Sequence, residues 1–418
     1  MSFQQGLSGL DAASSALDVI GNNVANSSTV GFKGATAHFA DLYAASLGLV
    51  GASQVGIGVT VSAIQQQFTQ GNLTTTNNPL DLAINGGGFF RMSQGGAIGY
   101  TRNGQFHIDN QGYIINDQTL RLTGYPVTAS GQIAPSNPVE LQLTASQIPP
   151  RATSDPLSGD IAAVINLDSR DTVPALSPFN PANPETYNFS TALTVFDTLG
   201  VVHNLSTFYV LNAPSAPAGG EWTLYATLDG ADPLTPGPVG NLAFDTSGAL
   251  NPASALQTLP SWTLSSGAVS PWSPGTMDFT GTTQYGSESN VDSLTQGGFA
   301  SGSLVSVGVG IDGVVQGRYS NGQTRNMGQV VLATFTDPNG LLNLGNNQWR
   351  STSLSGPELI GTPASGSRGV VQSAAVEDSN VDLTNELVAM ITAQRNYQAN
   401  AQTIKTQDQI MQTLVNLR

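Results

Sequence analysis

The sequence contains no cysteine among its 418 residues. A chain without thiols forms no disulfide bond and offers neither a thiolate metal ligand nor a cysteine nucleophile. Charged residues are scarce as well, at 10% of the chain, and Lys+Arg 13 stand against Asp+Glu 28. The resulting formal net charge of -15 disfavours contact with nucleic acid and with anionic membrane surfaces. We therefore expect neither as a partner.

Long hydrophobic runs are also missing, so the sequence predicts no membrane insertion. The N-terminal part has no basic residue before Lys33, no apolar run of signal-peptide length, and two acidic residues, Asp11 and Asp18. These features argue against a cleaved secretory signal. Taken alone, they suggest a cytosolic protein. The length of 418 residues predicts two or three domains.

Chemistry-bearing motifs are equally scarce. His38, His107 and His203 are far apart in sequence, and each is interpreted as a surface or packing residue instead of a ligand or base. The glycines at 86–88 lack a Walker lysine and are interpreted as a tight turn. The acidic and amide residues at 378–382 do not continue as a calcium loop and are assigned to a helix cap. We predict no catalytic site, no metal and no cofactor.

What the sequence does have is one long segment free of glycine and proline, from Val381 to Arg418, in a chain with 47 Gly and 23 Pro. This segment is expected to form one helix, with Ser379 and Asp382 at capping-box spacing before it. Its apolar residues recur at steps of four and three, interrupted by Gln394 and Asp408. The stripe consists of Leu383, Leu387, Met390, Tyr397, Ala401, Ile404, Met411 and Val415.

A second stripe lies at the other end of the chain. Its residues are Phe3, Leu7, Leu10, Leu17 and Val24, and the helix that carries them is expected to end near Gly21 to Asn23. The two helices could cover one globular core. Because the middle of the chain has its own β pattern, we expect them instead to pair with each other as a coiled coil and with copies from neighbouring chains. All thirteen stripe residues are therefore assigned to subunit assembly.

Between the helices the sequence is rich in turn signals. Asn103-Gly104 and Asn321-Gly322 favour type I′ hairpins, and the residues at 337–340 favour a further turn. Nineteen of the 23 prolines lie between Pro126 and Pro274, where alternating stretches at 193–195 and 205–211 indicate strands. Residues 27–70 could be a strand or an extended linker. The middle of the chain is thus expected to be mainly antiparallel β structure.

At this point a family resemblance becomes clear. Two terminal runs resemble the ends of bacterial flagellar axial proteins: NNVANSSTVGFK at 22–33 and LVAMITAQRNYQANAQTIKTQDQIMQTLVNLR at 387–418. The second resembles flagellar hook proteins in particular. The resemblance continues through LDLAINGGGFFRM at 80–92, FDTLGVVHNL at 196–205 and YGSESNVDSLTQGGFASG at 285–302.

The resemblance implies a non-enzymatic structural subunit that polymerises into the hook, the flexible curved tube that transmits torque from rod to filament. It implies contacts with other hook subunits, the distal rod, the hook cap, the hook–filament junction proteins, the hook-length control protein and the flagellar type III export apparatus. It also implies location in the extracellular hook, after export without a cleaved signal peptide.

The resulting domain organisation has four parts. A terminal helical assembly domain is expected at 1–26 and 379–418, connecting segments at 27–70 and 359–378, a hairpin-rich β domain at 71–145 and 283–358, and an inserted Pro-rich outer β domain at 146–282.

Three alternatives remain from the residues. A rod protein of the same family would share both terminal runs, a β-rich adhesin would explain the middle, and an enzyme would need a cluster of titratable residues that spacing does not reveal. For the helices themselves we expect order only on assembly, because nucleation is costly and both stripes contain weak positions.

Overall fold

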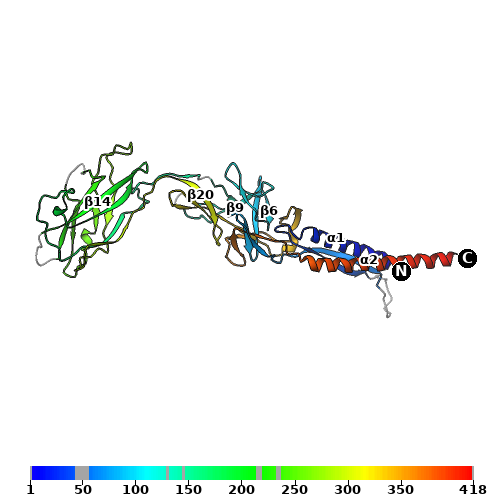
Figure 1. Cartoon of the computed structure of the whole chain (residues 1–418). Helices are drawn as coiled ribbons and strands as arrows, with labels where there is room; N and C mark the ends of the chain where they lie inside the picture. Colours follow the sequence, from blue (N-terminus) through cyan, green and yellow to red (C-terminus); the bar gives the residue numbers. More distant parts are fainter. Residues whose placement is uncertain are drawn as a thin grey trace. The chain divides into compact units, whose positions relative to one another are not determined.

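The chain divides into two compact units in the computed structural model (Figure 1), which describes residues 2–42, 56–128, 131–143, 146–212, 219–231 and 237–416. The first unit comprises Met1–Ala145, Ser306–Arg318 and Thr324–Arg418. The second comprises Ser146–Val305 and Tyr319–Gln323. No helix in the described part of the chain is long and apolar enough to cross a membrane.

The first unit contains both helices, α1 (Ser2–Ala25) and α2 (Leu383–Asn416). A two-stranded antiparallel hairpin of β1 (Ala35–Leu42) and β2 (Gly58–Gln66) follows α1. Two further strand pairs join the N-terminal part to the C-terminal part of the chain: β3 (Leu73–Thr75) with β28 (Ala375–Glu377), and β4 (Leu82–Asn85) with β27 (Val370–Ser373). The stretch left open between strand and linker, residues 27–70, thus contains two strands.

A larger sheet follows the path β11-β20-β21-β22-β9-β5-β6-β25-β24. Most of its strands lie in the first unit, whereas β11 and the residues of β20 up to Val305 belong to the second. Strand β11 pairs with the first residues of β20 at the start of this path. The strands on the path are β5 (Phe89–Gln94), β6 (Ala97–Thr101), β9 (Arg121–Tyr125), β11 (Gln147–Ile148), β20 (Gly302–Val309), β21 (Val314–Tyr319), β22 (Thr324–Val330), β24 (Leu342–Gly345) and β25 (Gln348–Arg350). Strands beside it are β7 (His107–Ile108), β8 (Ile114–Ile115), β10 (Val139–Glu140), β23 (Leu332–Thr334) and β26 (Leu359–Gly361), with a 3-10 turn at η3 (Pro338–Gly340).

The core of the first unit is apolar and fully enclosed by these strands. Leu82, Ile84, Phe90 and Leu332 are at most 1% exposed, and Phe90 meets Phe106 edge to face. The continuous burial of β4 on both faces explains why its sequence is apolar without strict alternation.

The second unit is built from two four-stranded sheets. One has the order β17-β18-β12-β19 and the other β13-β14-β15-β16. Their strands are β12 (Ile161–Asn166), β13 (Phe189–Phe196), β14 (Val202–Leu211), β15 (Glu221–Leu228), β16 (Gly240–Ala243), β17 (Leu256–Thr258), β18 (Thr276–Asp278) and β19 (Asn290–Thr295), with short turns η1 (Pro184–Thr186) and η2 (Pro252–Ser254). Trp222, Trp262 and Trp272 lie in one core cluster between the sheets. The prediction of mainly antiparallel β structure with two terminal helices is confirmed.

The boundary of the second unit lies further along the chain than residue 282, where the sequence placed the end of the insertion. Residues 283–305 belong to the second unit, because β19 pairs with β12 from Ala162 to Asn166. The 3-10 turn at Pro338–Gly340 and the positive φ angles of Gly86 and Gly88 match the turns expected there.

The predicted type I′ hairpin at Asn103-Gly104 is wrong. Neither residue has a positive φ, and the Asn103 side chain instead accepts a hydrogen bond from the Gln105 backbone at 3.0 Å. The reason for glycine at 104 is close backbone approach: a Cβ there would overlap the carbonyl oxygen of Leu82. At the second signal, Asn321-Gly322, a hairpin does form between β21 and β22, but only Gly322 has a positive φ, so the turn is not type I′.

The helix ends also differ from expectation. The first helix continues to Ala25, because the side chain of Asn23 exchanges two hydrogen bonds with the backbone of Ala35 and remains inside the helix. The second helix begins at Leu383 with Asp382 as its N-cap, whose carboxylate accepts from the Thr384 and Asn385 amides. The Ser379 hydroxyl accepts from Val381 outside the helix, so no capping box forms and most of the residues at 378–382 serve other contacts.

Two glycine substitutions test this account of local packing. Gly104→Ala should destabilise the first unit by about 1–3 kcal/mol, because the added methyl group displaces the Leu82 backbone. Gly21→Ala is the matched control: no atom lies within 4 Å of the position of its Cβ, so helix propensity should stabilise by up to about 1 kcal/mol. Calorimetry of the purified chain measures both, and a harmless Gly104→Ala would contradict the packing argument.

Candidate assembly surface

The two helices lie against each other in antiparallel orientation (Figure 1). A Cβ on Gly6 would stand 3.2 Å from Ile404, and one on Gly9 would stand 2.9 Å from the Asn400 side chain. At the other end of the pair, Asn23 donates to Glu386 at 3.0 Å. The glycines of α1 let the helix backbones approach closely, so that Ile404 and Asn400 of α2 pack against small residues of α1.

The hairpin β1–β2 covers another side of α1. The Gln5 side chain donates to the carbonyl of Gly56 at 2.5 Å, and the Ser8 hydroxyl accepts from the Val59 amide at 3.3 Å. With α2 and the hairpin in place, Ala12 and Ala13 of α1 are buried. The exposed part of α1 is thereby reduced to a narrow strip.

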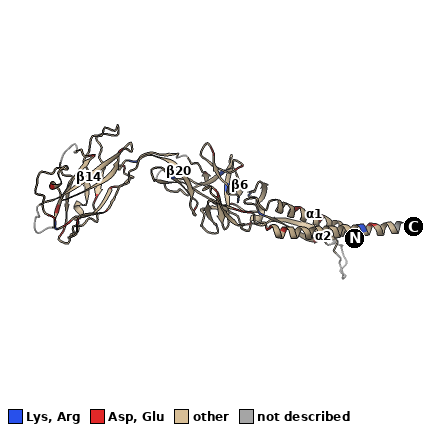
Figure 2. Ribbon diagram, viewed as in Figure 1, with Lys and Arg blue, Asp and Glu red and all other residues tan. Residues whose placement is uncertain are grey.

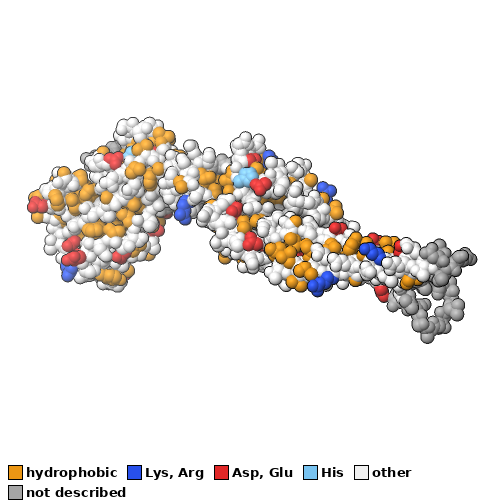
Figure 3. All heavy atoms as spheres, turned by 45° about the vertical axis from the view of Figure 1, so that its right-hand side comes forward, with side chains coloured by type: hydrophobic (Ala, Val, Ile, Leu, Met, Phe, Trp, Pro, Cys, Tyr) orange, Lys and Arg blue, Asp and Glu red, His pale blue; other side chains and the backbone are white. Residues whose placement is uncertain are grey.

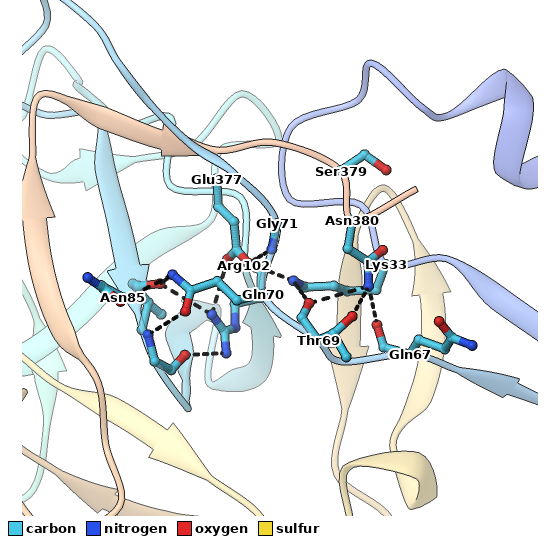
Figure 4. Close-up of polar contacts among 12 residues, drawn as sticks. Lys33, Gln67, Thr69, Gln70, Gly71, Asn85, Arg102, Glu377, Ser379 and Asn380 are labelled. Atoms are coloured by element: carbon cyan, nitrogen blue, oxygen red, sulfur yellow. Dashed lines mark hydrogen bonds and ion pairs between the residues drawn. The ribbon is translucent and has the colours of Figure 1, made fainter. Parts of the chain in front are cut away.

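The helices join the β structure through a buried ionic cluster of Lys33, Arg102 and Glu377, called here the buried triad (Figure 4). The Lys33 ammonium lies 2.6 Å from one oxygen of the Glu377 carboxylate, and the Arg102 guanidinium lies 3.1 Å from the other. Lys33 and Glu377 side chains are 0% exposed and Arg102 is 4% exposed. Three segments far apart in sequence therefore meet at one carboxylate.

Hydrogen bonds complete the surroundings of the triad. Lys33 also donates to the Thr69 carbonyl at 2.7 Å, Gly71 donates to Glu377 at 3.0 Å, and Arg102 donates to the Gly86 carbonyl at 2.9 Å. Burial lowers the pKa of the Lys33 ammonium, against the opposing attraction of Glu377. Burial likewise lowers the pKa of Arg102. The cluster contains two cationic side chains and one carboxylate. Loss of the carboxylate would therefore leave two buried cations without a counter-charge.

Asn380, three residues before α2, forms hydrogen bonds with neighbouring segments beside the triad (Figure 4). Its amide donates to the Gln67 carbonyl at 2.7 Å and the Thr69 hydroxyl at 2.8 Å, and its oxygen accepts from Gly34 at 2.8 Å. These contacts were missed from the sequence, where Asn380 was assigned to a helix cap.

The thirteen residues predicted for assembly are only partly brought together within one chain. In α1, Leu10, Leu17 and Val24 are half-buried, whereas Phe3 is 51% and Leu7 45% exposed. In α2 the half-buried members are Met390, Ala401 and Ile404, and the exposed members are Leu383, Leu387, Tyr397 and Met411. The side chain of Val415 lies outside the described residues.

The two faces of α2 differ in character. The side that meets α1 carries Met390, Ala393, Asn400 and Ile404, and Ala393 is the only buried side chain among those described for this helix. In the space-filling view, hydrophobic side chains lie exposed on the helical part of the first unit, next to charged ones (Figure 3). Charged residues are thinly spread over both units (Figure 2). The surface is thus largely uncharged and partly apolar.

The second unit contains a cluster that resembles a reactive site at first sight. The His203 ring lies 2.6 Å from Asp229 and 3.4 Å from Asp197. The Ser266 hydroxyl, however, donates to Asp197 at 2.7 Å and not to the histidine, so no nucleophile is activated. His203 is 7% exposed and links the turn after β13 to the turn after β15, as a packing residue would. Among the described residues no group of three or more acidic or histidine side chains could hold a metal ion.

Four family models match parts of the sequence. They are described as flagella basal body rod protein over residues 3–33, flagellar hook protein FlgE/F/G D1 domain over 83–158, flagellar basal body protein FlaE D2 domain over 166–299, and flagellar basal body rod FlgEFG protein C-terminal over 372–417.

Curated relatives and a solved structure agree with these matches. The chain is 41% identical to the flagellar hook protein FlgE of Escherichia coli (strain K12), with 100% of both chains covered. It is 32% identical to that of Rhizobium meliloti (strain 1021), with 100% of this chain and 98% of the relative covered. The crystal structure of the Helicobacter pylori flagellar hook protein FlgE2 is similar in fold, with a TM-score of 0.51 at 12% identity, covering 72% of this chain and 99% of that one.

The buried triad has two cations for one carboxylate, so we expect the loss of the carboxylate to destabilise the first unit more than the loss of one cation. Glu377→Gln leaves two buried cations without a counter-charge and should destabilise the first unit by about 3–5 kcal/mol. Lys33→Met leaves Arg102 and Glu377 paired one to one and removes two hydrogen bonds of Lys33, so it should cost less, about 2 kcal/mol at about 1 kcal/mol for each bond. Calorimetry compares the two variants, and equal losses would mean that Glu377 is not the centre of the cluster.

Proposed function

The chain belongs to the family of bacterial flagellar hook proteins, and we propose from this membership that the helix faces left exposed in one chain are its contacts with neighbouring subunits. It is a structural subunit of the flagellar hook and self-assembles into the flexible, curved tube that transmits torque from the rod to the filament. Of the thirteen stripe residues predicted for assembly, the six that remain exposed in one chain are proposed as contact residues: Phe3, Leu7, Leu383, Leu387, Tyr397 and Met411.

The observation that carries this proposal is how little the helices bury in one chain. Among the described side chains of α2 only Ala393 is buried, although the helix runs for 34 residues. Helices in water gain most of their stability from packing an apolar face. Covering Leu387 or Met411 by a neighbouring copy would contribute about 1.5–3 kcal/mol for each side chain. Several such contacts together supply the stability that one chain lacks.

A rod protein of the same family was the alternative left open by the terminal runs. The full-length similarity to hook proteins, which extends through the second unit, favours the hook instead.

Further partners are proposed from the role in the hook. The two ends of a hook must meet the distal rod and the junction with the filament, and a growing hook needs its cap, its length-control protein and the flagellar type III export apparatus. We propose that the subunit reaches the extracellular hook through this apparatus with its N-terminal segment retained, and that it has no catalytic role.

A substitution on the exposed face of α2 tests the assembly role. Met411 is 60% exposed, so Met411→Asp should leave the folding of both β units unchanged while it prevents assembly, because a carboxylate would enter an apolar contact between copies. Met411→Leu is the conservative control and should assemble. Electron microscopy of hooks formed in a bacterium that lacks its own hook subunit gives the readout. Normal curved tubes from Met411→Asp would contradict the assignment.

A further inference from the structure

The acidic residues of α1 and the basic residues of α2 lie on two complementary strips, whereas the acidic residues of α2, Glu386 and Asp408, lie outside them. Apart from Phe3, the exposed residues described for α1 recur at steps of three and four and form one strip, called here the α1 strip: Gln4, Leu7, Asp11, Ser14, Asp18, Asn22 and Ala25. Asp11 and Asp18 are the only charged residues of α1, and both lie on this strip. The α1 strip is therefore purely acidic.

A second strip runs along α2 on the side opposite to the one that packs on α1. Its members are also spaced by three and four and are all exposed: Val388, Ile391, Arg395, Gln398, Gln402, Lys405 and Gln409. Arg395 and Lys405 are the only basic residues of α2 and both lie on this α2 strip. At 100° per residue the strip is centred about 160° from the row Met390, Ala393, Asn400 and Ile404 that faces α1.

None of these four charges forms an ion pair with any residue that the structure describes. The two strips thus carry two acidic and two basic side chains without an ion-pair partner among the described residues, in a chain with only 13 basic residues. Because the α2 strip points away from α1 of the same chain, its cations are placed to meet another molecule.

We propose that the α1 strip of one subunit docks on the α2 strip of a neighbouring subunit, through ion pairs of Asp11 and Asp18 with Arg395 and Lys405. This rests on the proposed self-assembly. Copies that repeat along a tube with one polarity place α1 of one against α2 of the next in the antiparallel sense, as within a chain. Such an interface is heterologous and propagates without closing on a dimer.

The spacing of the charges fits this docking. With Asp18 opposite Arg395, Asp11 lies opposite Gln402, seven residues along each helix. Lys405 is three residues further on, about 4.5 Å at 1.5 Å per residue, within reach of its flexible side chain. The same alignment places Ala25 opposite Val388, which is 60% exposed, so an apolar contact flanks the ion pairs. Opposite charges across an interface select the partner and fix its register.

Charge reversal with mixing provides the test. The variant Asp11→Lys, Asp18→Lys carries basic strips on both helices, and the variant Arg395→Glu, Lys405→Glu carries acidic strips on both. Each is made as the full chain in a bacterium that lacks its own hook subunit, alone and together. Hooks are counted by electron microscopy, and exported subunit is measured in the culture medium.

Each variant alone should form at least about tenfold fewer hooks than the unmodified chain, because like charges would face each other at every contact. Both together should restore hook number to within about twofold, because alternating copies again present opposite charges. Restoration by mixing also shows that both variants fold and are exported. The control Arg318→Glu, Arg350→Glu reverses two exposed cations outside the helices and should assemble normally.

Three results would overturn the docking: normal assembly of either helix variant, failure of the mixture to restore hooks, or an equal defect in the control. An unmodified chain that forms no hooks would instead count against the proposed function itself.

Discussion

The carboxylate of Glu377 is the contact on which the arrangement of the first unit depends. It accepts from Lys33, Arg102 and the Gly71 amide in a place closed to solvent. Lys33 lies in the segment after α1, Gly71 between β2 and β3, and Arg102 directly after β6, whereas Glu377 itself lies in β28, before α2. A single buried carboxylate with two cations tolerates no loss of its own charge. The start of α2 and the end of α1 are thereby held at the edge of a β core.

The helices differ from the β core in how much of their surface is buried within one chain. The core strands bury their side chains almost completely, whereas α2 is mostly exposed and contacts α1 through small residues such as Gly6 and Gly9. A helix that hides so little of its apolar surface is stabilised by what covers it from outside. Charged residues make up only 10% of the chain, so few other charges compete with those on the two helix strips, which favours one register over others.

The sequence predicted the parts of this molecule that depend on periodicity. Steps of three and four in α1 and α2 and the turn at Pro338 were readable because each is a local pattern. The buried triad was not readable, since Lys33, Arg102 and Glu377 are 69 and 275 residues apart along the chain and no local rule joins them. The hairpin prediction at Asn103-Gly104 was wrong because the Asn-Gly pattern is local, whereas the reason for glycine at 104 is a tertiary contact, the approach of the Leu82 backbone. The face of α2 that meets α1 shares Met390 and Ile404 with the predicted stripe, but it also carries Asn400, which the apolar pattern did not include.

Hydrogen exchange of the backbone amides in α2, compared between the free subunit and the assembled hook, tests most directly whether the helices depend on neighbouring copies. The account predicts weak protection from Leu387 to Met411 in the free subunit and strong protection in the hook, because packing between copies supplies the missing stability. Amides of β4 and β27, in the core beside the triad, should be protected in both. Strong protection of α2 already in the free subunit would show that one chain stabilises its own helices and would contradict the account.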